Sequence, residues 1–142
     1  MGRPATPDDV DRICGELPDT EFGTSWGDLP TWKVPRGGKG KMFLLYRMPH
    51  RTAVDPATGE MYDDLVVILT PTAAEKQALV DDPATPFFTI DHFRSYDAVL
   101  VQQSRLGELD VEELREIITD AWAKRAPKRL VREHLGDTGS PR

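Results

Sequence analysis

Apolar residues recur at helical spacing close to the start of the chain. The positions i, i+3, i+4 and i+7 of one helix face are occupied by Val10, Ile13, Cys14 and Leu17. Just before them, Thr6-Pro7 supplies an N-cap and a proline at the first helical position. The pattern predicts a helix over residues 7–17, with the Cys14 thiol packed inward as a small hydrophobe rather than exposed as a reactive group.

Short β-prone runs follow in the middle of the chain. Residues 31–34 and 41–48 flank a glycine-rich turn at 35–40 and predict a β-hairpin. The unbroken apolar run from Leu65 to Leu69 predicts a central strand buried on both faces. Residues 87–90 and 98–102 predict a strand-like segment and a final strand. We expect residues 18–30 to form a loop, with Phe22 and Trp26 covering the edge of the core.

Two further helices alternate with these strands. Thr70-Pro71 repeats the cap-and-proline signature and predicts a helix to about Val80. Asp110 opens a capping box before a long apolar stripe, and Pro127 ends or kinks that helix ahead of a short segment over 130–135. The whole pattern predicts an α+β two-layer sandwich of order α-β-β-β-α-β-β-α, with helices packed on an antiparallel sheet of about five strands. We expect one domain over residues 1–136 and a flexible tail over 137–142.

Length and composition narrow the classes of protein that fit. The chain has 142 residues, enough for one core. Its longest apolar run is far shorter than the roughly 20 residues of a membrane helix, and its start has no secretory h-region. One cysteine and three scattered histidines provide neither a disulfide nor a tetrahedral zinc site. We therefore expect a cytoplasmic protein without a metal or other cofactor, in monomeric or weakly dimeric form.

The charge is segregated along the chain. The net charge is -6, which ordinarily disfavours nucleic acid. Residues 29–54, however, contain six bases and no acid, and residues 124–132 contain five bases and no acid. Each basic run is either a solvated face or part of a polyanion site, and the fold decides whether the two converge.

An ordered set of short segments resembles a known family. The segments are Ser25-Trp26-Gly27, Pro30-Thr31-Trp32-Lys33-Val34, Gly40-Lys41-Met42-Phe43, Leu69-Thr70-Pro71, Phe87-Phe88, His92-Phe93-Arg94-Ser95-Tyr96, Val99-Leu100-Val101, Ala121-Trp122 and Arg125-Ala126-Pro127-Lys128-Arg129-Leu130. Over roughly residues 8–132 the chain resembles the MmcQ/YjbR-like proteins, small bacterial domains often described as DNA-binding. The resemblance implies a double-wing sandwich in which two β-rich wings and the sheet face approach DNA. The longer, acid-containing turn from Arg51 to Asp64 departs from the simplest form of that pattern.

These observations favour a non-enzymatic DNA-binding protein that contacts the phosphate backbone. The expected contacts are Lys33, Arg36, Lys39, Lys41 and Arg47 of the hairpin region, Lys124, Arg125, Lys128 and Arg129 of the C-terminal run, and Trp32 as a wedge or stacking group. The alternative is a protein-interaction or small-ligand-binding module, for which Trp26, Trp32 and Phe43 would form an exposed patch instead of covering the core.

Signals for an enzyme are weak. The three histidines lie far apart in sequence, and residues 37–40 lack the spacing of a phosphate-binding loop. His92, beside Tyr96 and Asp97, is more typical of a structural turn than of a catalytic group.

Overall fold

The sheet of this protein is antiparallel throughout. A computed structural model describes residues 3–25, 29–47, 49–51 and 53–135. The strands are β1 (Glu21–Ser25), β2 (Leu29–Val34), β3 (Lys41–Arg47), β4 (Leu65–Leu69) and β5 (Ala98–Gln102). They lie side by side in the order β1-β2-β3-β4-β5, and each neighbouring pair is antiparallel.

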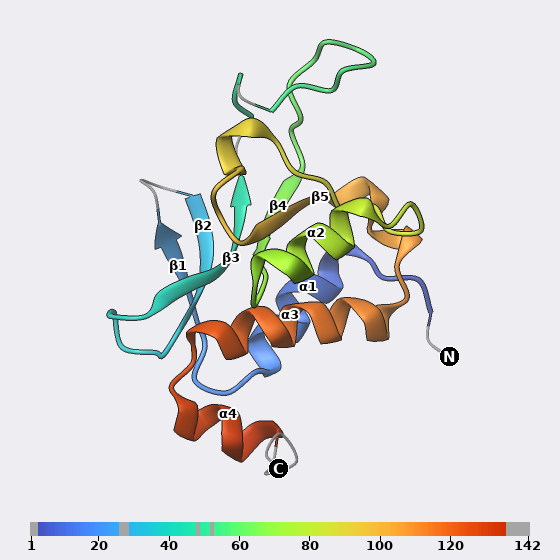
Figure 1. The fold of residues 1–142 in the computed structure, drawn as a ribbon. Coiled ribbons are helices and arrows are strands. Elements are labelled where there is room, and N and C mark those ends of the chain that lie inside the picture. The colour runs from blue at the N-terminus through green and yellow to red at the C-terminus, as the bar shows by residue number, and fades with distance from the viewer. Residues whose placement is uncertain (1–2, 26–28, 48, 52, 136–142) are drawn as a thin grey trace.

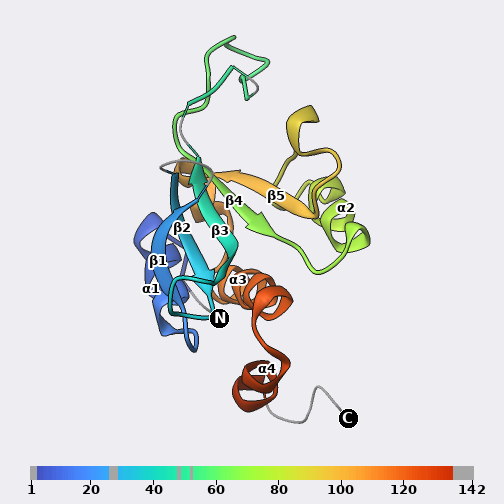
Figure 2. The ribbon, with the colours of Figure 1, turned by 90° about the vertical axis from the view of Figure 1, so that its left-hand side faces the viewer.

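Helices cover this sheet to form the second layer. They are α1 (Pro7–Glu16), α2 (Ala73–Asp81), α3 (Val111–Arg125) and α4 (Lys128–Leu135), with two 3-10 turns at Asp91–Phe93 and Gln103–Glu108. Helices α1 and α3 pack together and α3 lies along β3 and β4, whereas α2 lies against β5 (Figures 1 and 2). The predicted α+β sandwich with a five-stranded antiparallel sheet is confirmed.

Strand β4 is buried on both faces, as its unbroken apolar sequence predicts. On one face, Val66 of β4 lies beside Tyr46 of β3. This face is turned toward α1, because the Tyr46 hydroxyl donates to Asp11 of that helix at 2.7 Å. Residues of the other face, Val67 and Leu69, share a cavity with Phe93, whose side chain is 1% exposed. The segment around Phe93 therefore acts as a partial second cover for the sheet.

Two strand assignments differ from the sequence prediction. Residues 21–25, expected within a loop, form the edge strand β1 and pair in register with β2. Residues 87–90, expected to be strand-like, make only an isolated β-bridge, between Phe88 and Leu100. Phe22 is 53% exposed but lies edge-on to Trp32, with ring centroids 5.2 Å apart. Trp26 and the expected tail over 137–142 lie outside the described residues.

The cap of α3 is the predicted one, since Asp110 accepts a hydrogen bond from the Glu112 amide. The cap of α2 lies two residues after the predicted Thr70, because the Thr70 amide donates to the carbonyl of Asp97 and Thr72 instead accepts from the Glu75 amide. Cys14 is fully buried on α1, as expected, and burial raises the pKa of its thiol. Within the described ranges, every helix is too short or too polar to cross a membrane.

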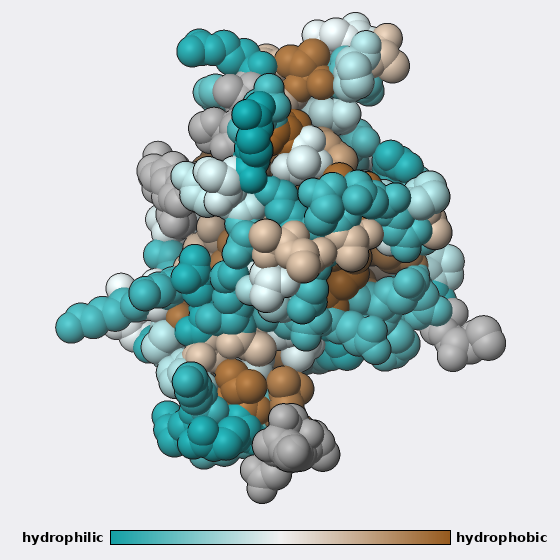
Figure 3. All heavy atoms as spheres, in the orientation of Figure 1, coloured by the Kyte–Doolittle hydropathy of each residue, from teal (hydrophilic) through white to brown (hydrophobic). Residues whose placement is uncertain are grey.

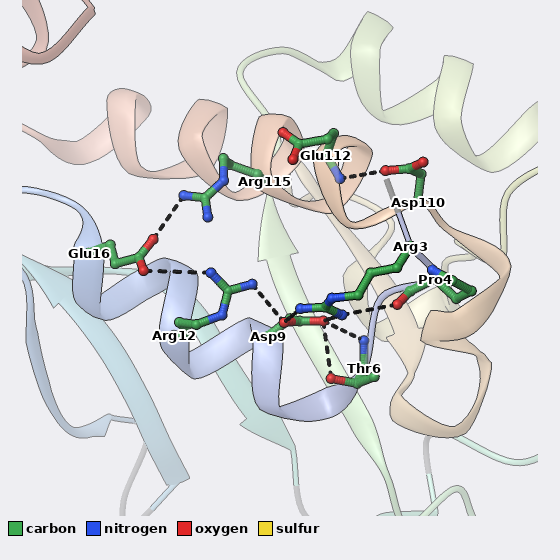
Figure 4. A network of polar contacts seen from close by, with 9 residues as sticks. All are labelled: Arg3, Pro4, Thr6, Asp9, Arg12, Glu16, Asp110, Glu112 and Arg115. Carbon is green, nitrogen blue, oxygen red and sulfur yellow. Dashed lines mark hydrogen bonds and ion pairs between the residues drawn. The ribbon is translucent and has the colours of Figure 1, made fainter. Parts of the chain in front are cut away.

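A buried carboxylate anchors the N-terminal segment to α1 (Figure 4). The side chain of Asp9 is 3% exposed and accepts two hydrogen bonds from the Arg3 guanidinium, at 2.8 and 2.6 Å. It also accepts from Arg12 at 2.7 Å and from the Thr6 amide at 2.8 Å. The bonds from Arg3, followed by those from Arg12 and Thr6, hold the pKa of Asp9 well below its usual range against the opposing effect of burial.

The same network reaches α3. Arg12 lies 3.5 Å from the carboxylate of Glu16, and Arg115 of α3 lies 3.1 Å from its other oxygen (Figure 4). The carbonyl of Arg3 accepts a hydrogen bond from the Val111 amide at 2.9 Å. The start of the chain is thus tied to the first turns of both helices.

We predict that Asp9→Asn lowers the free energy of unfolding by about 2–3 kcal/mol at pH 7, because the amide loses charge-assisted bonds inside the fold. The folded pKa is depressed, so the contribution is complete above about pH 4 and declines as the pH falls toward the folded value. Urea unfolding between about pH 2.5 and 7 measures this, and the gap to the wild type should narrow in acid.

Asp8→Asn is the matched control, since Asp8 is an exposed acid in the same helical turn. We expect it to change stability by about 0.5 kcal/mol. Equal losses for the two variants at pH 7 would show that the buried network has no special weight.

Candidate functional site

The two basic runs meet at one end of the sheet. The β2–β3 turn and the junction of α3 with α4 lie at the same end of the molecule in both ribbon views (Figures 1 and 2). A direct contact joins them, because the Nε of Arg125 donates to the carbonyl of Met42 at 3.2 Å. The tip of the turn projects as hydrophilic surface at the left of Figure 3. We name this region, from residues 33–41 and 125–129, the basic end.

A pocket of about 420 Å³ opens at the basic end. Three cationic residues line it, namely Lys33, Lys41 and Arg125, together with Gly40. Its apolar and aromatic wall consists of Met42, Val67, Leu69, Phe93, Tyr96 and Ala98. None of these lining residues is acidic, although the whole chain carries a net charge of -6. The pocket thus combines positive charge at its mouth with an apolar interior.

Several cations of the basic end have no protein partner among the described residues. They are Lys33, Lys39, Lys41 and Lys128, which make no hydrogen bond or ion pair there. Lys39, Lys41 and Lys128 are exposed, and Lys33 is half-buried. Their charges are therefore available to an external anion.

Other predicted site residues are engaged by the fold. Arg36 donates from Nε to the carbonyl of Thr20 at 3.2 Å, which ties the turn to the loop after α1. Arg129 lies 3.6 Å from Glu133 on α4, an exposed pair. Lys124 donates to the carbonyl of Pro71 at 3.1 Å and lies 3.4 Å from a carboxylate oxygen of Asp97. Asp97 lies between Tyr96 and Ala98, so its contact with Lys124 is next to two residues that line the pocket.

Arg47 and Trp32 lie apart from the pocket. Arg47 ends β3, six residues beyond Lys41 and hence about 20 Å along the strand. It is 9% exposed, its guanidinium lies 5.4 Å from the Phe93 ring centroid, and burial lowers its pKa. Trp32 points to the helical face of the sheet, where its Nε1 donates to Asp11 at 2.9 Å. Neither residue lines the pocket, although Arg47 contacts Phe93 of the pocket wall from the far end of β3.

The glycine-rich turn is shaped by local contacts. Gly37 and Gly38 adopt φ values of 114° and 88°, which favour glycine. Their amides donate to one carboxylate oxygen of Glu21 at 3.3 and 3.1 Å. At Gly40, an added Cβ would collide with the carbonyl oxygen of Pro35. Glycine at position 40 therefore allows the chain to turn back tightly beside the pocket.

A buried lysine holds the aromatic wall of the pocket. The ammonium of Lys76, on α2, donates to the carbonyls of Phe93, Arg94 and Tyr96 at 2.8, 3.3 and 2.6 Å. The residue is 6% exposed, and burial lowers its pKa. Lys76 satisfies three carbonyls at once and fixes the segment that carries two lining side chains.

Sequence reasoning missed this part of the site. Residues 92–96 enter the sequence prediction only through the family resemblance, and the first of them, His92, is interpreted there as a structural turn histidine. The side chain of His92 lies outside the described residues, so that interpretation is not tested. One signal was present for Lys76, which is the only base in the acidic stretch 55–82. Among the described residues, no group of three or more potential ligands could hold a metal ion.

Comparisons with known proteins bear on the family and the fold. A family model described as YjbR matches residues 15–124. The uncharacterized proteins Mb2600 of Mycobacterium bovis and Rv2570 of Mycobacterium tuberculosis are each 36% identical over 140 residues, which cover 95% of this chain and 99% of theirs. The crystal structure of Deinococcus radiodurans protein DR2400, family-model domain DUF419, has a TM-score of 0.60 at 20% identity and 96% coverage of both chains. This last likeness concerns the fold alone.

We predict that Lys76→Met loosens the pocket wall. Three carbonyls would lose the Lys76 ammonium as a donor, at a cost of about 1–3 kcal/mol in the free energy of unfolding. Hydrogen exchange should quicken at the amides of residues 93–98. Lys39→Met is the control, because it removes an exposed lysine and should leave both quantities unchanged. Wild-type exchange over 93–98 in Lys76→Met would contradict the assigned role.

Proposed function

This chain belongs to the YjbR family, and we propose that it is a non-enzymatic DNA-binding protein that contacts the phosphate backbone through the basic end. The observation that carries the proposal is the convergence of both basic runs around a pocket without acidic residues. The contacting cations are Lys33, Arg36, Lys39, Lys41, Arg125, Lys128 and Arg129.

The local arrangement of charge at the basic end supports DNA binding, although the net charge of the whole chain is negative. A protein with net charge -6 is repelled by a polyanion at long range. Within about 8 Å, the Debye length at physiological ionic strength, the nearest charges dominate. At the basic end these are unpartnered lysines together with the terminal nitrogens of Arg125, which have no partner among the described residues. Binding is then local, modest and strongly dependent on salt.

The kind of contact favours backbone recognition over sequence recognition. Lysine ammonium groups act on phosphates as point charges on flexible stems and carry no base information. The family match includes the β2–β3 turn and Lys124 but ends before Arg125, Lys128 and Arg129. The turn is therefore the portion of the basic end that the family model covers.

A second candidate function is supported by the pocket itself. Its volume of about 420 Å³ falls within the range of small-molecule sites, roughly 300–1,000 Å³. An apolar wall with cations at the mouth suits a small organic anion. A protein of this kind would bind its ligand in the pocket and show no dependence on the length of an oligonucleotide.

The DNA proposal is tested by reversing charge at the turn. We expect Lys39→Glu/Lys41→Glu to weaken binding to a short labelled duplex at least tenfold at about 50 mM salt. The slope of log affinity against log salt should become shallower by about 2, because two phosphate contacts are lost. Fluorescence anisotropy between about 50 and 200 mM salt measures both quantities.

Arg51→Glu/Arg105→Glu is a control matched in charge. Arg51 follows β3 and Arg105 follows β5, so both lie at the end of the sheet away from the turn. We expect this variant to retain most of the wild-type affinity. Equal losses in the two double variants would mean that net charge alone governs binding, and absence of wild-type binding at low salt would refute the DNA role.

A further inference from the structure

Contact with phosphates does not explain the apolar wall of the pocket at the basic end. The pocket wall is apolar and aromatic, with Val67, Leu69 and Ala98 from two neighbouring strands and Phe93 beside them. Phosphate contacts alone would leave this surface facing water. Small-molecule sites of this size characteristically pair an apolar interior with a few placed polar groups. The pocket thus fits a ligand with both an apolar plane and a nearby negative charge.

We propose that the pocket receives one unpaired nucleobase of a single strand, while the flanking phosphates lie on Lys33, Lys41 and Arg125. This inference rests on the proposed function and specifies its substrate as single-stranded or locally unpaired DNA. In an intact duplex each base is stacked and paired, so only its edges are accessible. A splayed base presents both faces, and it stacks on aromatic side chains irrespective of its sequence.

Tyr96 is the stacking group in this arrangement. Its side chain is 48% exposed and lines the pocket, and its ring centroid lies 5.5 Å from that of Phe93. Phe93 is buried and supports Tyr96 from within the fold. Tyr96 therefore replaces Trp32, which is held on the other face of the sheet by Asp11 and Phe22.

The platform is rigid before any ligand arrives. Lys76 bonds the carbonyls on both sides of the turn that carries Tyr96, and Lys124 approaches the carboxylate of the next residue, Asp97. A backbone held in this way at Tyr96 loses little conformational freedom on binding, which favours affinity. The cations at the mouth are long and flexible, so they can adapt to the path of the backbone.

Charge around the pocket agrees with one strand passing over it. Lys33 and Lys41 come from paired strands, at positions one step apart in register, and Arg125 comes from the end of α3. The Nζ of Lys33 lies 4.0 Å from the position of a Cβ added at Gly23, so its ammonium extends over the edge strand β1. Lys41 and Arg125 thus flank the pocket from β3 and α3, and Lys33 extends the positive surface toward β1, which suits phosphates before and after a single inserted base.

The test compares a short labelled single strand with its duplex at one salt concentration, using the full-length protein. We expect the wild type to bind the single strand about tenfold more tightly. Tyr96→Leu should reduce single-strand affinity about tenfold and leave duplex affinity unchanged, because only the stacked base is lost. Tyr96→Phe keeps the ring and should bind as the wild type does, which guards against an effect of misfolding.

Phe22→Leu is the matched control, because Phe22 is an aromatic residue of similar exposure away from the pocket. A set of single strands, each with one abasic position at a different place, adds a second readout. One abasic position should cost the wild type about as much as Tyr96→Leu does, and should cost Tyr96→Leu little more.

The outcomes separate this inference from the proposed function. Equal affinity for strand and duplex, sensitive to Lys39→Glu/Lys41→Glu but not to Tyr96→Leu, would overturn the base pocket and leave backbone binding in place. No binding of either nucleic acid at low salt would overturn both. Loss of duplex and single-strand affinity to the same extent in Tyr96→Leu would also overturn the base pocket, since it would assign Tyr96 to the fold or to general contact.

Discussion

The burial of β4 on both faces is the constraint from which the rest of the structure follows. Five consecutive apolar residues need cover on two sides, and the chain provides it unequally. Helix α3 packs against one face, whereas the segment around Phe93 covers the other only in part. That segment is irregular, and the ammonium of Lys76 adds a donor from α2 to the few hydrogen bonds that its own amides make. The pocket remains where the second cover ends.

Charged groups are paired in one part of the molecule and unpaired in another. Acidic and basic groups pair closely where α1, α3 and the N-terminal segment meet, with Asp9 at the centre. At the basic end the opposite holds, because several lysines lack a partner among the described residues. Pairing stabilises the fold, whereas unpaired like charges oppose it by mutual repulsion. The uneven distribution is therefore a cost that a purely structural role would not require, and it makes the net charge of the chain a poor guide to its partners.

Sequence patterns predicted the elements whose signals are local. The cap at Asp110 and the apolar run of β4 depend on residues within a few positions, and both were confirmed. The helix predicted after Thr70-Pro71 is present as α2, but its cap is Thr72, two residues later. Strand β1 was missed because its sequence, with Gly23 at the centre, has little strand propensity and depends on pairing with β2. Residues 87–90 had strand propensity but found a partner at only one position.

The candidate site was predictable to a smaller extent for the same reason. Local charge identified Lys33, Lys41 and Arg125, and the fold brought them together. Burial of Arg47 and the alternation that sends Trp32 to the helical face depend on tertiary packing, which no local pattern records. The same holds for the long-range bonds of Lys76, which join α2 to a segment about 20 residues away.

The carboxylate of Glu21 at the glycine turn determines how the turn can discriminate among anions. Successive amides that converge on one point form a ready-made cradle for a phosphate or sulfate. Here Gly37 and Gly38 direct theirs at Glu21, so the protein fills that cradle with its own anion. The turn therefore attracts an external anion through the charge of its lysines and not through a shaped amide site. Any selectivity among polyanions has to come from the apolar wall of the pocket.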